Sequence, residues 1–334
     1  MKASLYSIFK NQKKFLLFTV GLSFFLFSKS PETETYNSQN CHKKTNTELP
    51  FVIVIASYNN KDWYELNLDS VFMQNYENYR IIYIDDMSPD QTGDLVEKYI
   101  ENHPLKEKIT LIKNKERKLK MENVYLAIHS CDDDEIVMIL DGDDWLAHEN
   151  VLSRINHEYL SADIWITYGS YEDIYEGETP SIRRCANISP AVKNKKDPIK
   201  KIIRNSADYI PGHPKTFYAW LFKKIKAEDL YYDGVFAASA SDAVMAHPLH
   251  EMARGRCAFI PEILYIHNSI NPLNDSKVDR NLQKGISTYH RNLPRTYFSL
   301  NSPEDTPHKI LASSAKLLSL QNWRAQAIAR ERKK

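Results

Sequence analysis

Glycine is scarce in this sequence of 334 residues, which has nine glycines and neither GxGxxG nor GxxxxGK followed by Ser or Thr. A glycine-rich loop that cradles phosphate through its backbone is therefore absent. The four cysteines show no CxxC spacing, so a zinc site is not expected, and the sequence assigns no disulfide. Neither sign of charge is in excess, since 44 Lys and Arg face 43 Asp and Glu. This balance argues against nucleic acid as the main partner.

One long apolar run is present near the N-terminus, "FLLFTVGLSFFLFS" at residues 15–28, and Lys10, Lys13 and Lys14 precede it. These fourteen residues are few for a bilayer span, which needs about 20 residues. We predict that residues 1–30 are a membrane-targeting segment, either a signal anchor or a signal peptide. Residues 31–49 lack apolar periodicity and are predicted to form a stem or linker.

The lysines before the apolar run predict an N-terminus that stays cytoplasmic, as in a single-pass type II membrane protein. The rest of the chain would then face the Golgi or ER lumen in a eukaryote. A bacterial source would instead place the protein at the inner membrane with a cytoplasmic catalytic face.

Four apolar runs follow, and their starts lie about 27 to 30 residues apart, which is the length of a strand plus a returning helix. They occupy residues 51–55, 81–84, 109–112 and 136–140. Continuous apolar runs suit parallel strands covered on both faces. We predict an α/β fold with a Rossmann-like, mostly parallel open sheet flanked by helices. It forms a single catalytic domain over residues 50–290, divided into halves at 50–150 and 151–290.

The segment between the first two runs is predicted to be a helix. Trp63, Leu66, Ser70 and Met73 share one face at helical spacing, and Asp62 stands where it could cap the start.

The stretch "DGDDW" puts three carboxylates, Asp141, Asp143 and Asp144, directly after the run at 136–140. In open α/β sheets, ligands bind outside the carboxyl ends of the strands. Adjacent carboxylates repel each other unless a cation lies between them, and Mg²⁺ or Mn²⁺ binds carboxylate and phosphate oxygens readily. The stretch therefore predicts a metal-bridged diphosphate site, with Asp144 left unassigned.

A second acidic stretch, "CDDDE" at 131–135, lies before the same strand and fails this positional test. We expect its aspartates to form a solvated turn. They are Asp132, Asp133 and Asp134.

Polar residues also follow the first two apolar runs. Ser57, Tyr58 and Asn59 come after the first run, and Asp85, Asp86 and Asp90 come after the second. Each group alone could be a turn or a helix cap. Three groups at strand ends are expected to converge on one rim of the sheet.

At this point the chain resembles a known family. "VIVIASYNN", "IIYIDDMSPDQT" and "IVMILDGDDW", in this order and spacing, resemble the family 2 glycosyltransferases, which have the GT-A fold and an Asp-x-Asp motif. The resemblance implies transfer of a sugar from a nucleotide-diphosphate donor, with Mn²⁺ or Mg²⁺ as cofactor. The enzyme would be a hexosyl- or N-acetylhexosaminyltransferase acting on a glycan, lipid or protein acceptor.

The resemblance also implies roles for the residues at the three strand ends. Ser57, Tyr58 and Asn59 match the segment that lines the nucleoside, and Asp85 or Asp86 matches the acid that accepts from the base, often uracil. Asp90 matches the last acid of the second motif, which contacts the donor directly in fewer members of the family. Asp141 would face the ribose and metal, and Asp143 would bind the metal.

The stretch "NKERKLKMENVYLAI" resembles the family's next donor segment but lacks its glycine. Asn123 matches the asparagine of that segment. Lys118 or Lys120 would supply the basic contact with the nucleotide, and the missing glycine leaves the choice between them open.

In the second half, the resemblance assigns the general base to Asp242, which would deprotonate the acceptor hydroxyl in a single inverting displacement. His267 is a candidate third metal ligand, although a lone His is more often structural. His213 and Trp220 are candidates for the acceptor side. Tyr218, Trp220 and Phe222 can equally be core, and we expect at least two of them to be.

Residues 291–334 are predicted to be a C-terminal helical tail with a basic end. Two alternatives to the enzyme stay open. One is a non-catalytic protein of the same fold that binds sugar nucleotides or glycans. The other is a nucleotidyltransferase, but that class normally has a glycine-rich triphosphate loop near the first strand, and "ASYNN" is not one.

Overall fold

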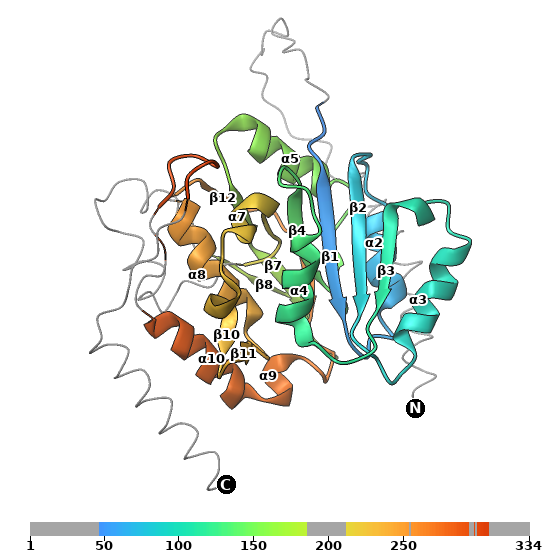
Figure 1. The fold of residues 1–334 in the computed structure, drawn as a ribbon. Coiled ribbons are helices and arrows are strands. Elements are labelled where there is room, and N and C mark those ends of the chain that lie inside the picture. The colour runs from blue at the N-terminus through green and yellow to red at the C-terminus, as the bar shows by residue number, and fades with distance from the viewer. Residues whose placement is uncertain (1–46, 186–211, 254, 294–296, 298, 307–334) are drawn as a thin grey trace, which may run out of the picture. The chain divides into compact units, whose positions relative to one another are not determined.

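The computed structural model describes residues 47–185, 212–253, 255–293, 297 and 299–306 (Figure 1). The chain divides after residue 47, and the fold below belongs to the unit Glu48–Lys334. The apolar run at 15–28, most of the predicted stem and the tail from residue 307 lie outside the described residues. Within the described residues, no helix is long and apolar enough to cross a membrane.

A seven-stranded sheet forms the centre of the fold (Figure 1). Its strands in spatial order are β12 (Cys257–Ile260), β6 (Ile166–Gly169), β9 (Lys215–Tyr218), β4 (Ile136–Asp141), β1 (Phe51–Ser57), β2 (Tyr79–Asp85) and β3 (Ile109–Lys113). Strands β4, β1, β2 and β3 are parallel, whereas β9 runs antiparallel to both β4 and β6. The four predicted strands and the mostly parallel open sheet are confirmed.

Helices cover both faces of the sheet because the side chains of each strand alternate between two apolar clusters. Val52 and Val54 of β1 belong to one cluster, with α4 (Leu119–His129), α7 (Ala219–Lys223) and α8 (Ser241–Ala253). Ile53 and Ile55 belong to the other, with α2 (Tyr64–Phe72), α3 (Thr92–Glu101) and α5 (Val151–Ser161). This double cover explains why the strands read as continuous apolar runs.

The predicted face of helix α2 was wrong. Tyr64, Leu68 and Val71 are its buried apolar residues, while Met73 lies outside the helix and is 51% exposed. No side chain caps the start of α2, so the predicted cap at Asp62 is not made. Compared with the predicted face, the helix turns Asn67 inward, and Ser70 is buried as predicted. The Asn67 amide donates to the Asp141 carbonyl oxygen, and Ser70 Oγ accepts from Leu146 N after β4.

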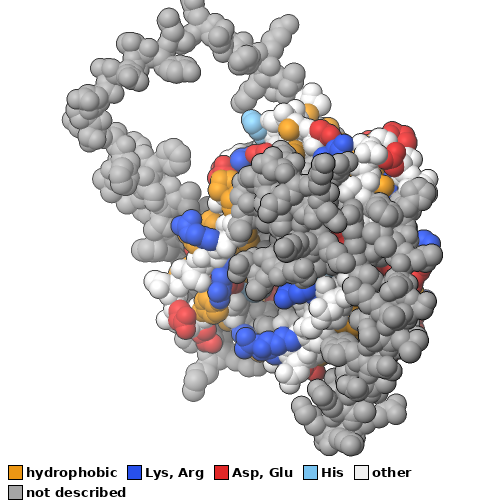
Figure 2. Space-filling view, turned by 90° about the vertical axis from the view of Figure 1, so that its left-hand side faces the viewer, with side chains coloured by type: hydrophobic (Ala, Val, Ile, Leu, Met, Phe, Trp, Pro, Cys, Tyr) orange, Lys and Arg blue, Asp and Glu red, His pale blue; other side chains and the backbone are white. Residues whose placement is uncertain are grey.

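The strands of a second sheet alternate along the chain with those of the central one, and its order is β5 (Trp145–Leu146), β13 (Tyr265–Asn268), β7 (Tyr171–Ile174) and β8 (Ser181–Arg183). A hairpin of β10 (Tyr231–Tyr232) and β11 (Val235–Phe236), the 3-10 turns η1 (Lys106–Lys108) and η3 (Ala227–Leu230), and helices α9 (Asp275–Val278) and α10 (Arg280–Asn292) complete the described elements. On the side shown in Figure 2, the visible described surface carries scattered charges of both signs.

Several smaller predictions can be compared with the fold. Asp132, Asp133 and Asp134 are exposed in a turn, as predicted. Cys131 and Cys185 have free thiols. Core packing continues to Leu300, past the predicted domain boundary at residue 290.

Two glycines are expected to respond oppositely to alanine. In Gly169→Ala, the new Cβ would lie 2.7 Å from the Ile260 carbonyl oxygen of the neighbouring strand, so we expect a loss of about 1–3 kcal/mol of unfolding free energy. In Gly285→Ala, inside α10, the nearest atom would be Tyr232 Oη at 3.9 Å, and we expect a gain of about 0.5–1 kcal/mol. Denaturant unfolding of both variants measures the difference. Equal effects would contradict the tight packing of β6 against β12.

Candidate functional site

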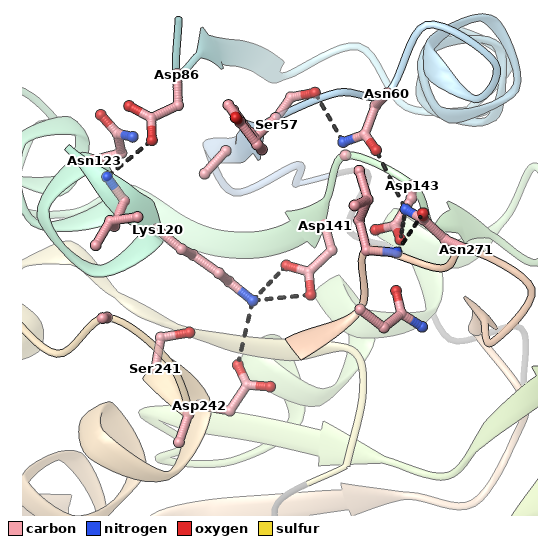
Figure 3. A pocket seen from close by; sticks show the side chains of 18 of the residues that line it. Ser57, Asn60, Asp86, Lys120, Asn123, Asp141, Asp143, Ser241, Asp242 and Asn271 are labelled. Atoms are coloured by element: carbon pink, nitrogen blue, oxygen red, sulfur yellow. Dashed lines mark hydrogen bonds and ion pairs between the residues drawn. The ribbon is translucent and has the colours of Figure 1, made fainter. Parts of the chain in front are cut away.

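A cleft of about 260 Å³ opens at the carboxyl ends of β1, β2 and β4 (Figure 3). Ten residues predicted from the sequence line it, namely Ser57, Tyr58, Asp86, Lys120, Asn123, Asp141, Asp143, His213, Asp242 and His267. Five other candidates do not line it, namely Asn59, Asp85, Asp90, Lys118 and Trp220. The fold therefore brings together residues as far apart in the chain as Ser57 and His267.

The turn after β4 is held on its inner side by helix α2. The Asn67 amide donates to the carbonyl oxygens of Asp141, at 2.9 Å, and Asp144, at 2.7 Å. Gly142 faces Ser57 and Asn60, and a Cβ at this position would lie 2.7 Å from Ser57 Oγ. Only a residue without a side chain lets the ends of β1 and β4 approach so closely.

The first two carboxylates of this turn have different partners (Figure 3). Lys120 Nζ lies 2.6 Å from Asp141 Oδ1 and 2.8 Å from Oδ2. Asp143 Oδ2 accepts from the Asn271 amide at 2.7 Å. Burial and the charge of Asp141 raise the pKa of Asp143, which is the expected result of placing two carboxylates close together.

The third carboxylate, Asp144, turns away from the cleft and is fully buried. Its Oδ2 accepts from the Tyr265 hydroxyl at 2.6 Å, and its Oδ1 accepts from the Asn268 backbone N–H at 2.7 Å. The Tyr265 hydroxyl also accepts from Asp141 N at 3.2 Å. Asp144 thus connects the turn to β13 and does not cap α5, which starts at Val151.

Asp86 is the acid after β2 that faces the cleft. It accepts from Lys118 N at 2.9 Å, Leu119 N at 2.8 Å and the Asn114 amide at 2.8 Å. Burial alone would raise its pKa, but these donors and Asn123 outweigh burial and lower it. Leu119 adopts a left-handed φ of 67°, so a non-glycine residue makes this turn in a segment that lacks the family's glycine.

The neighbouring acids have structural contacts instead. Asp85 accepts from Ser88 N at 3.2 Å and lies against Gly93. Asp90 accepts from Thr92 N at 3.0 Å and Lys61 N at 3.1 Å, so it joins the loops after β1 and β2. The structure therefore separates Asp86 from the other two candidates.

Lys120, rather than Lys118, is the lysine in the cleft. Lys118 Nζ pairs with Glu122 at 3.1 Å and does not line the cleft. Beside Lys120, the Arg117 guanidinium lies 3.6 Å from the centre of the Tyr58 ring and extends that wall of the cleft. Sequence reasoning missed Arg117, Asn60 and Asn271, because single polar residues in loops carry no periodic signal.

Asp242 lies in the first turn of α8, opposite the Asp-x-Asp turn. Its Oδ2 is 3.1 Å from Lys215 Nζ and 3.6 Å from His213 Nε2, and its Oδ1 is 3.9 Å from Lys120 Nζ. Desolvation would raise its pKa, but the ammonium groups of Lys120 and Lys215 hold that pKa well below its usual range. Asp242 is therefore ionised and 32% exposed at the cleft.

His267 is oriented by a buried carboxylate. Its Nδ1 lies 2.5 Å from Asp173 Oδ1, and Arg183 pairs with the other oxygen of Asp173. Burial would lower the pKa of His267, but Asp173, Asp144 and Asp141 outweigh it and raise the pKa to about 9. A carboxylate on Nδ1 is the arrangement that directs Nε2 of a ligating His toward a metal.

The donor set fits a divalent cation that takes further ligands from a bound phosphate. Asp141, Asp143 and His267 all line the cleft. Burial and the charge of Asp141 raise the pKa of Asp143, and a bound cation would favour its ionised form. Among the described residues, no group of three His, Cys, Asp or Glu side chains could hold an ion by itself.

The ring side chains predicted for the acceptor side or the core lie in two places. His213 lines the cleft and stacks on Tyr265 with ring centres 4.4 Å apart. Trp220 packs against Trp165 with centres 4.8 Å apart, and Phe222 is fully buried. Tyr218 and Trp220 are partly buried and pack against the core, and none of the three lines the cleft, so Trp220 is not on the acceptor side of the cleft.

Comparison with known proteins agrees with this geometry. The family described as glycosyl transferase family 2 matches residues 52–230, more than half of the chain. A crystal structure of S. aureus TarS 1–349 in complex with UDP-GlcNAc is similar at a TM-score of 0.53 and 16% identity, over 73% of this chain and 64% of that one. The chain thus spans less than two thirds of that TarS chain. The GT-A fold predicted from the sequence is confirmed.

A weaker likeness connects the chain to the mannosyltransferase PcManGT from Pyrobaculum calidifontis in complex with GDP-Man and Mn²⁺. Its TM-score is 0.44 at 17% identity, over 74% of this chain and 62% of that one. No curated protein matches the sequence.

The hydroxyl of Tyr265 is expected to stabilise the turn that carries the carboxylates. Tyr265→Phe would leave Asp144 Oδ2 and Asp141 N without this partner, so we expect a loss of about 1–3 kcal/mol of unfolding free energy. Tyr79→Phe is the matched control, because it removes a buried hydroxyl that has no hydrogen-bond partner and should be neutral or stabilising. Denaturant unfolding that ranks the two variants in the reverse order would contradict this role of Tyr265.

Proposed function

This chain belongs to glycosyl transferase family 2, and we propose that it moves a sugar from a nucleotide-diphosphate donor to an acceptor hydroxyl with inversion at the anomeric carbon. The observation that carries the proposal is the single cleft that holds Asp86, Asp141, Asp143 and Asp242 together (Figure 3). Acids for binding the donor and an acid for activating the acceptor thus face one another across it.

The donor side of the proposal rests on the wall that contains Tyr58, Asp86 and Arg117. An aromatic ring, a carboxylate of lowered pKa and a guanidinium suit a nucleoside, since Asp86 can accept from an N–H of the base. We propose a UDP-sugar first, because uracil offers such an N–H and because the similar TarS structure contains UDP-GlcNAc. The proposed diphosphate lies between Lys120 and the Asp-x-Asp turn.

Asp143, with His267 and Asp141, is proposed to hold a divalent cation, Mn²⁺ or Mg²⁺. When bound, the cation would offset the negative charge that develops on the leaving diphosphate. Lys120 can also offset the charge on the leaving diphosphate, because its ammonium lies beside Asp141 on a flexible four-carbon stem.

Asp242 is proposed as the general base that takes the proton of the acceptor hydroxyl as the oxygen attacks the anomeric carbon. Its carboxylate is ionised and reaches the cleft from the side opposite the turn. Because its pKa is lowered, its effect depends on position and on the loss of water when substrates fill the cleft. The presence of this acid favours turnover over the alternative of a non-catalytic sugar-nucleotide-binding protein.

A hexosyl or N-acetylhexosaminyl donor and a glycan, lipid or protein acceptor remain part of the proposal. We also propose that residues 15–28 attach the chain to a membrane. Protease protection of Asp242-containing fragments in sealed vesicles tests on which side the catalytic part lies.

Asp242→Asn is expected to lower the rate of sugar transfer, or of donor hydrolysis by water, by about 10²- to 10⁴-fold, because it removes the base. Affinity for UDP should stay within about twofold, equivalent to about 0.4 kcal/mol. The measurements are UDP release from UDP-sugars and calorimetric UDP binding. Asp133→Asn, in an exposed turn, is the control. Full activity of Asp242→Asn would rule out this base.

Asp143→Ala is expected to remove the effect of metal on donor binding. We expect Mn²⁺ to strengthen UDP binding by wild-type protein by about tenfold or more, equivalent to about 1.4 kcal/mol. The variant should bind UDP equally with Mn²⁺ and with EDTA, while Asp134→Ala behaves as wild type. A Mn²⁺ effect of the same size in Asp143→Ala would sink the metal assignment.

A further inference from the structure

Lys215 is a buried lysine at the edge of the sheet where the candidate site lies. It is the first residue of β9 and pairs with Ile139 of β4, two residues before Asp141. Because β9 runs antiparallel to β4, its start lies at the carboxyl edge of the parallel strands. The Lys215 side chain is only 9% exposed, which is unusual for a lysine.

Two groups contact the Lys215 ammonium. Nζ lies 3.1 Å from Asp242 Oδ2 and 3.1 Å from His213 Nε2. An ammonium can only donate, so His213 Nε2 accepts and the ring is neutral with its proton on Nδ1. The pKa of His213 is well below its usual value because of burial and the charge of Lys215, which agrees with a neutral ring.

His213 is itself held in place. Its ring stacks on Tyr265 with centres 4.4 Å apart and meets Tyr171 edge-on with centres 5.3 Å apart. Tyr265 in turn bonds to Asp144 in the Asp-x-Asp turn. The position of the Lys215 ammonium is therefore tied to the turn on the other side of the cleft.

Lys215 differs from Lys120 in what it can reach. Lys120 lines the cleft and can meet a diphosphate, whereas Lys215 does not line it. Any influence of Lys215 on a bound substrate must therefore pass through its two contacts in the cleft, Asp242 and His213. Stability is a weak explanation for such a pair, because exchanging a buried ion pair for apolar side chains is often neutral or stabilising.

Lys215 contacts one of the two carboxylate oxygens of Asp242. Its Nζ lies against Oδ2, while Oδ1 is buried, accepts no hydrogen bond within the described residues and lies 3.9 Å from Lys120 Nζ (Figure 3). The contact at Oδ2 therefore restricts the rotation of the carboxylate.

We propose that Lys215, oriented by His213, is a positioning residue that fixes the Asp242 carboxylate in the orientation in which it meets the acceptor hydroxyl. This inference rests on the proposed function, in which Asp242 is the base. Lys215 and His213 thereby belong to the proposed catalytic apparatus without contact between Lys215 and either substrate.

Lys215→Met tests the proposal, because methionine has a similar length and no charge. We expect kcat for UDP-sugar turnover to fall about 10- to 100-fold, part of the contribution of a general base, with KM for the donor and Kd for UDP within about twofold of wild type. Lys223→Met is the matched control. It breaks a 2.7 Å ion pair with Asp133 outside the cleft and should leave kcat unchanged.

Thermal unfolding of each variant checks that it is folded. If Lys215→Met is not folded, Lys215→Gln replaces it, since glutamine keeps a donor toward Asp242 without the charge. The same loss of kcat without loss of donor affinity is expected. Lys215→Arg, which retains a cation, should recover part of kcat.

The outcomes separate this inference from the function on which it rests. An active wild type, an impaired Asp242→Asn and a folded Lys215→Met with wild-type kcat would overturn the role of Lys215. Weaker UDP binding with unchanged kcat would overturn it as well. Absence of turnover in wild type, or full activity of Asp242→Asn, would instead overturn the proposed function.

Discussion

Electrostatic repulsion among carboxylates at the carboxyl edge of the sheet is the constraint on which the site depends. Asp86, Asp141, Asp143 and Asp242 share one cleft, and each has its charge compensated differently. Asp86 accepts backbone and amide N–H groups, Asp141 pairs with Lys120, and Asp242 pairs with Lys215. Asp143 accepts from the Asn271 amide and has no ion pair with a lysine or arginine among the described residues, and burial and the charge of Asp141 raise its pKa. The acid with the least compensation is the one proposed to receive the metal.

The carboxyl edge of the central sheet is where segments far apart in the sequence meet. The carboxyl ends of β1, β2 and β4 supply the donor side, and the antiparallel β9 delivers Lys215 to that edge from the opposite direction. Asn67 on α2 and Tyr265 on β13 then hold the turn after β4 from two sides. The polar residues on the buried face of α2 are therefore part of the support of the site.

Much of the fold and the site could be predicted from the sequence. The four parallel strands were visible because apolar runs with two-sided burial are local patterns, and strand ends placed Ser57, Asp86, Asp141 and Asp143 correctly. The orientation of α2 was not visible beyond Ser70, since inward-facing Asn67 looks polar in sequence. Lys120 could not be separated from Lys118, because helix orientation decides which ammonium enters the cleft. Lys215 gave no signal, since its partners come from α8 and the residues just before β9.

The stereochemical course of the reaction tests the central claim most directly. Incubation of the protein with a panel of UDP-sugars and a divalent cation, followed at once by proton NMR of the released sugar, reports the anomeric configuration before it equilibrates. A single displacement assisted by Asp242 predicts the inverted anomer. Release of the retained anomer would contradict the account, as would the absence of release from every donor in the panel.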